Sequence, residues 1–563
     1  MIFMDIEVFK YDWVVCYLNT DTRKLNYIAN DKDALMKLYH KYKNEIWVGY
    51  NIRGYDQYIF KSILTGFNPY DVSQFIIEEG RKGWEYSRMF NKFPMIIYDT
   101  MIFTRSLKEL EAYMGEDIQE TQVPFNLDRK LTKEELQQTI KYCSHDVWQT
   151  LNVFVESKSE FESHLGLIKE FELNPMYINK TKVQLSAIIL GARQGKPRDD
   201  EFDISFPDTL KLGKYEWIKD WYENWGKNVK DYEQMNLETD IAGVPHKFGI
   251  GGLHGAIDKY MGDGHYILAD VSSYYPALMI EYNLLSRNVS NPEKYKQIRD
   301  ERLKLKALRD PREYPRKIVL NGTYGAMKDK YNGLYDPLMA NNVCVYGQLL
   351  LVDLIDKLEG VVDIIQSNTD GVLFKLRSLE DKELALQICK GWSLRTRMDL
   401  GFEFYTKVIQ KDVNNFVMVE DNGGIKRKGS YTKELSKLDN DLPIVNKALV
   451  DYFIDNVPVE YTIMKSNNLI DFQKVTKVSW KYEFAVYKDK VLTERVHRTF
   501  ATIGDGGILY KRHKETGSLE KTAGTPENCV IINRNIQNDP VPDFIDRNWY
   551  IELAKKRIED FIS

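Results

Sequence analysis

The chain has 563 residues, of which 43% are apolar, so it is too long for one hydrophobic core and apolar enough for several. Its net charge of −5 neither indicates nor excludes nucleic-acid binding, because phosphate contacts depend on local clusters of Lys and Arg. The cysteines show no CxxC spacing, which argues against a disulfide framework and a cysteine zinc site. We expect buried, reduced thiols at Cys16, Cys143, Cys344, Cys389 and Cys529.

The N-terminus and the hydropathy pattern predict a cytoplasmic protein. Asp5 and Glu7 interrupt the first apolar run, which is unlike a secretory signal peptide. No stretch of the sequence is expected to approach a membrane span, and no membrane partner is expected.

The composition changes twice along the chain. Up to about residue 155, short β-like runs alternate with helices, and this part ends in an amphipathic helix predicted at 132–157. A connector rich in Trp, Tyr, Lys and Asp follows, to about residue 246. From Lys247 the chain is punctuated by glycine and then alternates strands and helices, whereas its last part is mixed. We therefore expect several domains of the α/β and α+β classes.

Two acidic residues share one face of the first predicted strand. The strand period of two places Asp5 and Glu7 on one face, and Ile6 and Val8 on the other. Neighbouring carboxylates repel each other unless a cation lies between them, so this face is a candidate metal site. A solvated edge strand fits the same pattern.

Two later segments add acids at defined spacings. Asn51, Tyr55 and Asp56 lie in a predicted turn between two apolar segments. Tyr142 and Asp146 are four residues apart, which places them on one face of the predicted helix. Each segment is a weak signal when taken alone.

The order of these segments resembles the three exonuclease motifs of proofreading domains with an RNase H-like fold: Asp-x-Glu, Asn-x-x-x-Tyr-Asp and Tyr-x-x-x-Asp. The resemblance covers about the first 150 residues. It implies that Asp5, Glu7, Asp56 and Asp146 bind two divalent ions, Mg²⁺ or Mn²⁺, and that Tyr142 orients the attacking water.

The resemblance also places the 3′ end of a single DNA strand beside these acids. Ser106 and Leu107 resemble the family's Ser/Thr-Leu element, which holds the primer 3′ end, and Asn51 and Tyr55 would contact the same strand. An ordinary helix cap at Ser106 fits the sequence equally well. We interpret His145 as a structural residue.

The segment around Asp270 carries the most specific motif in the chain. An apolar strand ends at Asp270, and a helix is predicted to begin near Pro276 with Ser272 or Ser273 as its cap. A helix N-terminus beside a carboxylate suits a metal-bound triphosphate. The segment resembles motif A of family B DNA polymerases, Asp-x-x-Ser-Leu-Tyr-Pro, with Tyr274 in place of Leu.

The resemblance to motif A implies roles for individual residues. Asp270 would bind both metal ions of a polymerase site, with Val271 as a further ligand, and Ser273 would contact the nucleotide. The ring of Tyr275 would exclude a ribose 2′-hydroxyl, whereas Tyr274 is expected to lie in the core.

A polar and aromatic helical face follows. Lys317, Asn321 and Tyr324 recur at i, i+4 and i+7, which places them on one face of a helix. They resemble motif B, Lys-x-x-x-Asn-Ser-x-Tyr-Gly, with Gly322 in place of Ser. The resemblance implies that this face contacts the incoming dNTP.

A basic helix is predicted at 295–309, before that face. It resembles the fingers helix of the family, in which an Arg and a Lys four residues apart grip the phosphates of the dNTP. Arg302 and Lys306 have this spacing. A solvated charged face better explains Lys304 and Arg309.

A β-hairpin is predicted at 363–375, from two apolar strands about a polar turn that ends in Asp-Gly. Taken alone it is an ordinary hairpin, but after motifs A and B it resembles motif C, Tyr-x-Asp-Thr-Asp-Ser. The resemblance makes Asp370 the essential metal ligand, with Asp270 as its partner. Three positions depart from the motif, at Gln366, Asn368 and Gly371.

Two weaker signals remain. Lys411 and Lys428 loosely resemble the lysine elements that hold primer-template duplex, and solvated surface charges explain them equally well. The glycine run at 248–252 lies near the position of the family's Tyr-x-Gly-Gly junction motif, and a tight turn is the alternative.

Taken in order, the motifs resemble a DNA-directed DNA polymerase of family B with a 3′→5′ exonuclease. The short intervals between motifs A, B and C favour a nucleic-acid-primed replicase of a compact bacteriophage type, acting in the host cytoplasm. Its partners would be primer-template DNA, dNTPs, a single-stranded 3′ end and accessory replication proteins. The resemblance predicts an RNase H-like exonuclease domain at 1–160, a connector at 161–246, a palm at 247–290 and 328–403, fingers at 291–327, and a thumb with the C-terminal region at 404–563.

Two other functions fit the sequence. Asn368 and Gly371 also suit a 3′→5′ exonuclease whose polymerase half is degenerate. A non-catalytic protein that only binds primer-template DNA would need the basic residues but not the acids. Metal-dependent primer extension separates the three functions.

Overall fold

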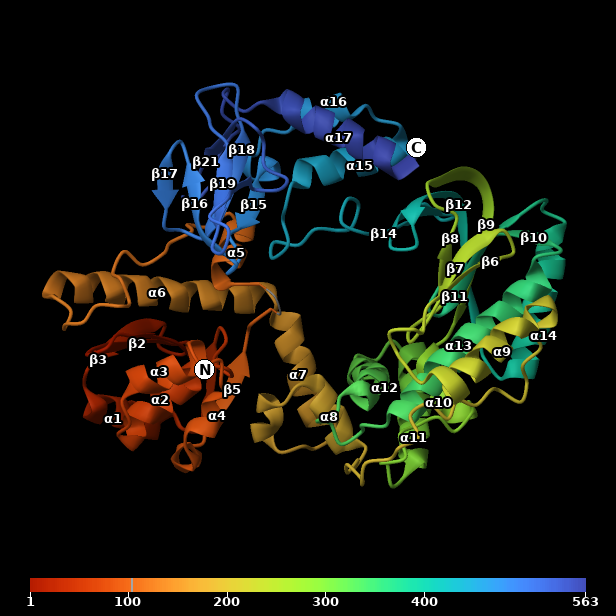
Figure 1. The fold of residues 1–563 in the computed structure, drawn as a ribbon, viewed down its shortest axis with the longest axis horizontal. Helices are drawn as coiled ribbons and strands as arrows, with labels where there is room; N and C mark the ends of the chain where they lie inside the picture. Colours follow the sequence, from red (N-terminus) through yellow and green to blue (C-terminus); the bar gives the residue numbers. More distant parts are fainter. Residues whose placement is uncertain (103–104, 563) are drawn as a thin grey trace.

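A computed structural model describes residues 1–102 and 105–562. The described residues form a mixed α/β fold of several parts, as predicted, with the four sheets ordered β3-β2-β1-β4-β5, β14-β13-β12-β9-β11-β10-β8-β7-β6, β15-β18-β21 and β17-β16-β19-β20. The N-terminal part, the largest sheet and the C-terminal region lie around the centre of the view in Figure 1. All five cysteines are free and buried, which confirms the prediction.

The N-terminal part is built on a five-stranded sheet in which β1 is central. Strand β1 is antiparallel to β2 and parallel to β4, and α6 packs against β1 and β2 while α2 contacts β1. Figure 1 shows α6 on one side of this sheet and α1 to α4 on the other. The bounds are β1 Ile2–Val8, β2 Trp13–Asn19, β3 Lys24–Ala29, β4 Ile46–Gly49, β5 Ile96–Asp99, α1 Lys32–Tyr42, α2 Asp56–Thr65, α3 Pro69–Ile77, α4 Gly83–Tyr86, η1 Arg88–Lys92, α5 Leu107–Met114 and α6 Lys133–Glu156.

The helix predicted at 132–157 is confirmed as α6. Its first turn is closed by a capping box, in which the Thr132 side chain accepts from the backbone N–H of Glu135 and the Glu135 side chain accepts from that of Thr132. Cys143, Val147 and Phe154 are buried on the side that faces the sheet.

A nine-stranded sheet carries the segments around residues 270 and 370. Its strand β9 lies between β11 and β12, both antiparallel to it, and the predicted hairpin is confirmed as β10 and β11. The predicted boundaries at 247 and 403 fall within this sheet. The bounds are β6 Leu237–Ile241, β7 Val244–Phe248, β8 His254–Ala256, β9 Tyr260–Val271, β10 Val362–Asn368, β11 Gly371–Leu376, β12 Leu400–Asp412, β13 Asn415–Glu420 and β14 Ile425–Lys428.

The connector and the fingers segment pack together beside this sheet. Helix α12 contacts α7, α8 and α11. A Cβ added at Gly322 of α12 would lie 3.2 Å from the hydroxyl of Ser186 on α8, so glycine permits this close approach. The bounds are α7 Lys158–Glu170, η2 Pro175–Asn179, α8 Lys182–Ile189, η3 Gly213–Tyr215, α9 Glu216–Asn224, η4 Trp225–Val229, α10 Tyr274–Glu281, α11 Pro292–Ala307, α12 Glu313–Lys328, α13 Pro337–Leu358 and α14 Asp381–Thr396.

One helix in the described part of the chain, α13, is long and apolar enough to cross a membrane. Its mean hydropathy reaches 1.5, and 94% of its most apolar window is buried inside the protein. The prediction that no stretch approaches a membrane span is therefore wrong. Helix α13 is highly apolar because it is a core helix, packed against α9, α10, α12, α14 and the large sheet.

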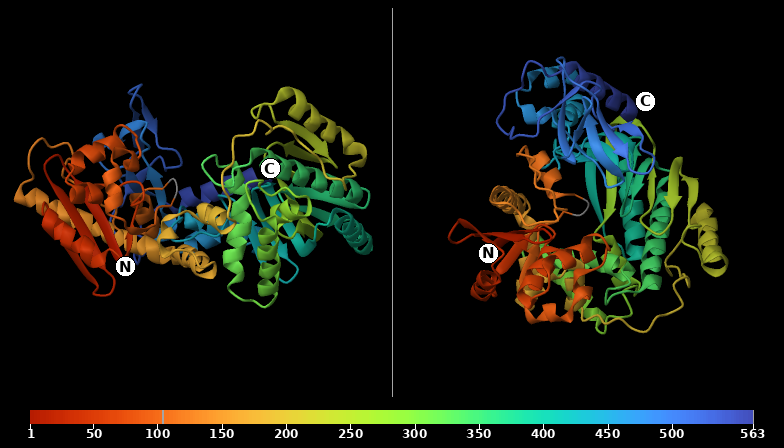
Figure 2. Two further views of the ribbon diagram at one scale, coloured as in Figure 1. Left: turned by 90° about the horizontal axis from the view of Figure 1, so that it is seen from below. Right: turned by 60° about the vertical axis from the view of Figure 1, so that its left-hand side comes forward.

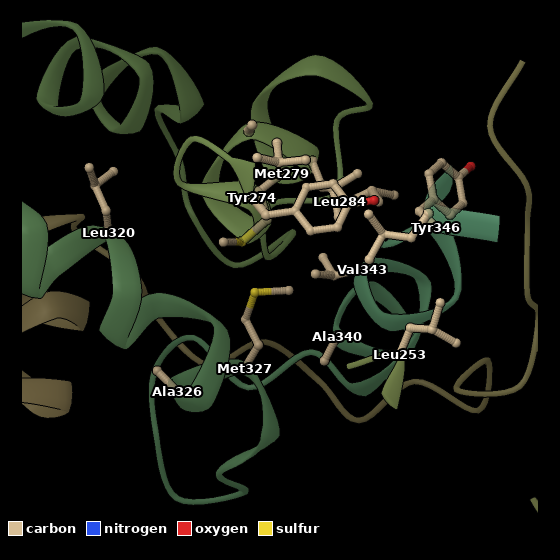
Figure 3. Packing of buried hydrophobic residues seen from close by; sticks show 14 of the residues in the cluster. Leu253, Tyr274, Met279, Leu284, Leu320, Ala326, Met327, Ala340, Val343 and Tyr346 are labelled. Atoms are coloured by element: carbon tan, nitrogen blue, oxygen red, sulfur yellow. The ribbon is translucent and has the colours of Figure 1, made fainter. Parts of the chain in front are cut away.

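Tyr274 lies in the core at the start of α10. It is 3% exposed and lies among Met279, Leu284 and Val343 (Figure 3). Its hydroxyl donates to the carbonyl of Gly347 on α13 at 2.7 Å. The expectation that Tyr274 belongs to the core is confirmed.

The C-terminal region contacts both other parts. Helices α15 and α17 pack against the large sheet, and β15 and β18 pack against α5. Figures 1 and 2 show this region, in blue, over α5 and beside the sheet. The bounds are α15 Pro443–Asp455, α16 Val459–Lys465, η5 Leu469–Phe472, β15 Lys474–Lys477, β16 Tyr482–Tyr487, β17 Lys490–Leu492, β18 Val496–Ala501, β19 Leu509–His513, β20 Leu519–Lys521, β21 Cys529–Ile531 and α17 Arg547–Ile562.

The buried hydroxyl of Tyr274 gives a test of this core. Tyr274→Phe leaves the Gly347 carbonyl without that donor, and we expect the free energy of unfolding to fall by about 1–2 kcal/mol. A urea titration followed by tryptophan fluorescence measures the change. Tyr331→Phe, at a side chain that is 84% exposed, is the matched control and is expected to have no effect. Equal stability of Tyr274→Phe and the wild type would contradict the packing described.

Candidate active sites

Four acidic side chains of the N-terminal part come together from three elements. Asp5 and Glu7 lie on β1, Asp56 is the first residue of α2, and Asp146 lies on α6. They meet because α6 and α2 both pack against β1. Glu7, Asp56 and Asp146 are each less than a tenth exposed. The structure thus assembles one buried centre from the four acids that the three motifs predict.

Burial and mutual repulsion raise the pKa of these carboxyl groups. Burial is the largest cause, and the pKa rises to about 6 at Asp5 and to about 7 at Asp146. The pKa of Glu7 and that of Asp56 lie well above the usual range, because burial and then the charge of Asp5 raise them. Carboxylates so placed are relieved by a cation among them, and oxygen donors suit Mg²⁺.

A lysine contacts this centre. Lys108, on α5, pairs with Asp146, and its Nζ lies 3.0 Å from Oε1 of the fully buried Glu111. Glu111, His145 and Asp146 offer ligand atoms within 4.8 Å of one another, but the Lys108 ammonium already binds two of the three. The charges of Lys108 and Glu111 cancel, so the charge of the four carboxylates is left for metal ions.

Tyr142 lies beside the same centre. The Lys108 ammonium is 4.7 Å from the centroid of its ring. Burial and then the charge of Asp146 raise the pKa of Tyr142 above its usual range, so the hydroxyl stays a hydrogen-bond donor at neutral pH. Tyr142 also lines a hollow of about 500 Å³, together with Gln138 and with Glu494 of the C-terminal region. The predicted position of Tyr142 beside Asp146 agrees with this geometry.

The turn before α2 is held by Asp99, at the end of β5. Its carboxylate accepts from the backbone N–H groups of Asn51 and Arg53, each at 2.9 Å. Asn51 has a φ of 63°, a conformation that Asn tolerates better than most residues, and its side chain is exposed. The hydroxyl of Tyr55 is hydrogen bonded to Ser73 at 2.8 Å. Asn51 is therefore accessible, whereas Tyr55 is tied into the fold.

Ser106 caps α5, as the simpler interpretation of the sequence expects. Its hydroxyl accepts from the backbone N–H of Glu109, whose carboxylate accepts from the backbone N–H of Ser106. Leu107 packs with the apolar cluster beneath the helix. The assignment of Ser106 and Leu107 to a DNA 3′ end stays a prediction.

Asp270 and Asp370 lie side by side at the ends of two paired strands. Gly371, the first residue of β11, is opposite Asp270 of β9, and the N–H of Val271 donates to the carbonyl of Asp370 at 2.7 Å. A Cβ at Gly371 would lie 3.0 Å from an Asp270 carboxylate oxygen, so glycine in place of the motif's serine makes room for it.

Two further charges face this second centre. Burial and then Asp370 raise the pKa of Asp270 to about 7, and burial raises the pKa of Asp370. Lys426 of β14 opposes both shifts, and its Nζ lies 2.7 Å from the carboxylate of Glu403 on β12. The charge of Glu403 adds to the rise at Asp270. Three carboxylates therefore lie at this centre, with the ammonium of Lys426 beside them.

Ser273 occupies the cap position of α10 but does not cap it. Its φ is 53°, and its hydroxyl makes no capping hydrogen bond within the described residues. It accepts instead from Arg302 at 2.6 Å, and the Nε of Arg302 donates to Glu313 at 3.1 Å. The prediction that Ser272 or Ser273 caps α10 is wrong, because Ser273 has a left-handed backbone in place of the extended backbone of a capping residue, and its hydroxyl accepts from Arg302. Arg302 is 7% exposed, while Lys306, one turn later, is exposed.

Tyr275 and Tyr324 bring motifs A and B into contact. Their ring centroids are 4.5 Å apart, in an edge-on arrangement at 66°. Lys317 and Asn321 are exposed on the same face of α12, as their spacing predicts. Lys328 continues that face, with its Nζ 4.7 Å from the centroid of the Tyr324 ring.

The weaker assignments lie farther along the sheet. Lys411 of β12 pairs with Asp560 of α17 at 2.6 Å, and Lys428 of β14 donates to Asn414 at 3.0 Å. The charge of Lys428 lowers the pKa of Asp370. Lys428 therefore acts on the second centre, whereas Lys411 is paired with Asp560.

The glycine run at 248–252 packs against the hairpin that carries Asp370. A Cβ at Gly252 would lie 2.8 Å from the Cα of Thr369, and Gln348 of α13 donates to the carbonyls of Gly249 and Gly251. Glycine at 252 therefore serves close approach of two chain segments.

Six residues at these centres were not predicted. Four of them had a local signal in the sequence. Asp99 ends an apolar run, and Lys108 and Glu111 are three residues apart in the first turns of a helix. Lys328 lies four residues after Tyr324 and so continues the helical spacing of motif B. Glu403 carries no such signal, and Lys426 begins the basic segment from which only Lys428 was selected. The pairing of β12 with β9 and of β13 with β14 brings both residues near the acids.

Comparisons with known proteins give a weak likeness of fold. No family model matches the sequence, and none of the curated proteins matches it. Among solved structures, the chain is similar to the family B DNA polymerase from the hyperthermophilic archaeon Pyrobaculum calidifontis, with 12% sequence identity and a TM-score of 0.40 over 100% of this chain and 77% of that one. An identity this low concerns the fold alone, so the function must be argued from the geometry.

The raised pKa of Glu7 predicts how stability changes with pH. The pKa of Glu7 in the folded state lies above the usual 4.5. The contribution of protonated Glu7 to the free energy of unfolding is therefore complete below pH 4.5 and is lost as the pH rises through the folded-state pKa. In EDTA at pH 8, the melting temperature of Glu7→Gln is therefore expected to exceed that of the wild type, and the difference is expected to shrink towards pH 5. Differential scanning calorimetry measures the melting temperatures at both pH values. Glu78→Gln, at an exposed position, is the control, and a margin that does not change with pH contradicts the buried centre.

Proposed function

We propose that this chain is a DNA-directed DNA polymerase of family B that carries a 3′→5′ proofreading exonuclease. One observation carries the proposal: two separate carboxylate centres, each assembled from distant motifs, in the order that the family shows. Asp270 and Asp370 form one, and Asp5, Asp56 and Asp146 belong to the other. Paired acids beside exposed basic residues suit phosphoryl transfer on polyanionic substrates.

Divalent ions fit both centres by donor chemistry, because each offers several carboxylate oxygens at raised pKa and a net negative charge. Two such ions per centre, Mg²⁺ or Mn²⁺, supply charge that stabilises the attacking and leaving oxygens when they are bound. The residues proposed to hold them are Asp5, Glu7, Asp56 and Asp146 in one centre, and Asp270 and Asp370 with Val271 in the other.

The exposed face of α12 supports the proposal of a dNTP site beside the polymerase centre. Lys317 and Asn321 project from the exposed face of α12, and a triphosphate beside Lys317 and Lys306 gains two cationic contacts. The Tyr275 ring, held against Tyr324, limits the room at the sugar. Arg302 is engaged by Ser273, so we assign it to holding the motif A turn in this conformation.

The exonuclease centre has the groups that hydrolysis of a 3′ end needs. The protonated hydroxyl of Tyr142 orients a water by hydrogen bonding. Lys108 fixes one oxygen of Asp146 and leaves the other for a ligand. We assign the exposed Asn51 side chain and the α5 end at Ser106 and Leu107 to holding the strand.

Asn368 favours a second candidate, a 3′→5′ exonuclease with a degenerate polymerase half. It lies opposite Gly371 in the hairpin, where the family has a carboxylate, so the centre loses one charged donor. A non-catalytic primer-template binding protein is the third. One observation argues against both of these candidates. The pKa of Asp270 and that of Asp370 are raised, so keeping the two acids adjacent costs folding free energy, and only a catalytic role explains that cost.

We also propose that synthesis begins on nucleic-acid primers and serves a bacteriophage genome in the host cytoplasm, with accessory replication proteins. The short intervals between motifs A, B and C support this proposal, because they leave little room for the insertions of protein-primed relatives.

Single substitutions separate the two activities. Asp270→Ala and Asp370→Ala are expected to lower primer extension about a thousandfold or more, because each removes several kcal/mol of metal-mediated stabilisation, while 3′ digestion persists. Asp5→Ala is expected to do the reverse. A 5′-labelled primer-template with Mg²⁺ measures extension when dNTPs are present and digestion when they are absent.

Asp363→Ala, an exposed acid on β10, is the control and is expected to leave both activities unchanged. A wild type that digests but never extends supports the second candidate, and one that does neither supports the third. Undiminished extension by Asp270→Ala would overturn the assignment of the polymerase centre.

A further inference from the structure

Helix α5 packs against the C-terminal region. Leu110 packs in one apolar cluster with Val475 of β15 and Val496 of β18. Lys477 of β15 pairs with Glu109 at 2.6 Å. A helix of the N-terminal part, about 370 residues earlier in the sequence, therefore shares its core with the C-terminal sheet.

A buried arginine on β18 closes the end of this helix. Arg498 is 0% exposed, and its Nη2 donates to the carbonyls of Ala112 and Glu116, each at 2.9 Å. Its Nη1 donates to the carbonyls of Ile532 and Arg534. The last carbonyls of a helix lack partners within the helix and carry the negative end of its dipole. A cation there satisfies the carbonyls and stabilises the helix end.

Within the described residues, the Arg498 side chain donates only to backbone carbonyls and to no carboxylate. Burial lowers the pKa of Arg498 to about 10, so it is charged at neutral pH. A buried charge without a counter-ion is tolerated only when its donors are bonded. The carbonyls of α5 must therefore stay in place for Arg498 to be accommodated.

The other end of the same helix reaches the acid centre. Lys108, in the first turn, pairs with Asp146. Glu111, three residues later, pairs with Lys108 through its side chain and accepts from Arg498 at 3.4 Å through its carbonyl. A continuous set of contacts therefore runs from β18, through α5, to a carboxylate of the exonuclease centre.

We propose that Arg498 is a positioning residue of the exonuclease centre, and that the C-terminal region is a structural component of that centre. By fixing the carbonyl end of α5, Arg498 holds Lys108 against Asp146 and sets the direction of the capped end at Ser106. This inference rests on the proposed exonuclease function.

Arg498→Met tests the proposal, because it keeps an unbranched side chain and removes the charge and the donors. The amides of residues 107–114 are expected to exchange faster with solvent, measured by hydrogen-deuterium exchange and mass spectrometry. Digestion of 3′ ends is expected to fall about tenfold to a hundredfold, since a shift of about 1 Å near the chemistry has that effect. Primer extension is expected to change little. Arg498→Lys, which keeps the charge and fewer donors, should restore part of both readouts.

Tyr550→Phe is the matched control. It removes a buried hydroxyl that links Ala501 and Phe472 in the same region and, within the described part of the chain, makes no hydrogen bond to α5, and it is expected to lower stability without changing α5 exchange or digestion. If Arg498→Met does not fold, Lys477→Met tests the same coupling at a half-exposed ion pair, with a smaller expected loss.

The possible outcomes distinguish a failure of the proposed role of Arg498 from a failure of the proposed exonuclease function. Wild-type exchange and digestion in Arg498→Met, or an equal loss of digestion in Tyr550→Phe, would overturn the role of Arg498. Exchange reports on α5 without catalysis. A wild type that digests no 3′ end therefore refutes the exonuclease, whereas unchanged α5 exchange in Arg498→Met refutes the coupling.

Discussion

Repulsion between carboxylates is the constraint on which both centres depend. Asp270 and Asp370 stay adjacent because β9 and β11 pair from Asp270 and Gly371 onward and the N–H of Val271 donates to the Asp370 carbonyl. Asp5 meets Asp146 because α6 is packed across β1. The pKa of each of these acids is raised, so ionising them opposes folding, and the cores beneath both sheets must compensate. Bound divalent cations would turn that repulsion into attraction, which links the stability of each centre to its chemistry.

The two centres differ in their burial and in the charges that lie beside their carboxylates. The N-terminal one is deeply buried, and its lysine, Lys108, is neutralised by Glu111. The second is more open, and Lys426 bridges to Glu403 beside its acids. The C-terminal region touches both parts of the chain, through Arg498 at α5 and through packing of α17 on the large sheet. A change in that region is thus able to affect both centres together.

Local periodicity was sufficient to predict much of this structure. The strand period placed Asp5 and Glu7, the capping box predicted the start of α6, and the spacing of Lys317, Asn321 and Tyr324 predicted one helical face. What failed depends on contacts between distant segments. The Ser273 hydroxyl is taken by Arg302, and α13 has the hydropathy of a membrane span because other helices cover it. Glu403 and Lys426 join the second centre only through strand pairing, which no local pattern reveals.

The most direct test of two metal-binding centres is a crystal structure grown with Mn²⁺ and measured at the manganese absorption edge. Anomalous scattering locates each ion without reference to activity. The account predicts Mn²⁺ among Asp5, Glu7, Asp56 and Asp146, and separately between Asp270 and Asp370. Mn²⁺ at only one of these centres would reduce the chain to a single metal-dependent activity, and Mn²⁺ at neither would contradict the account.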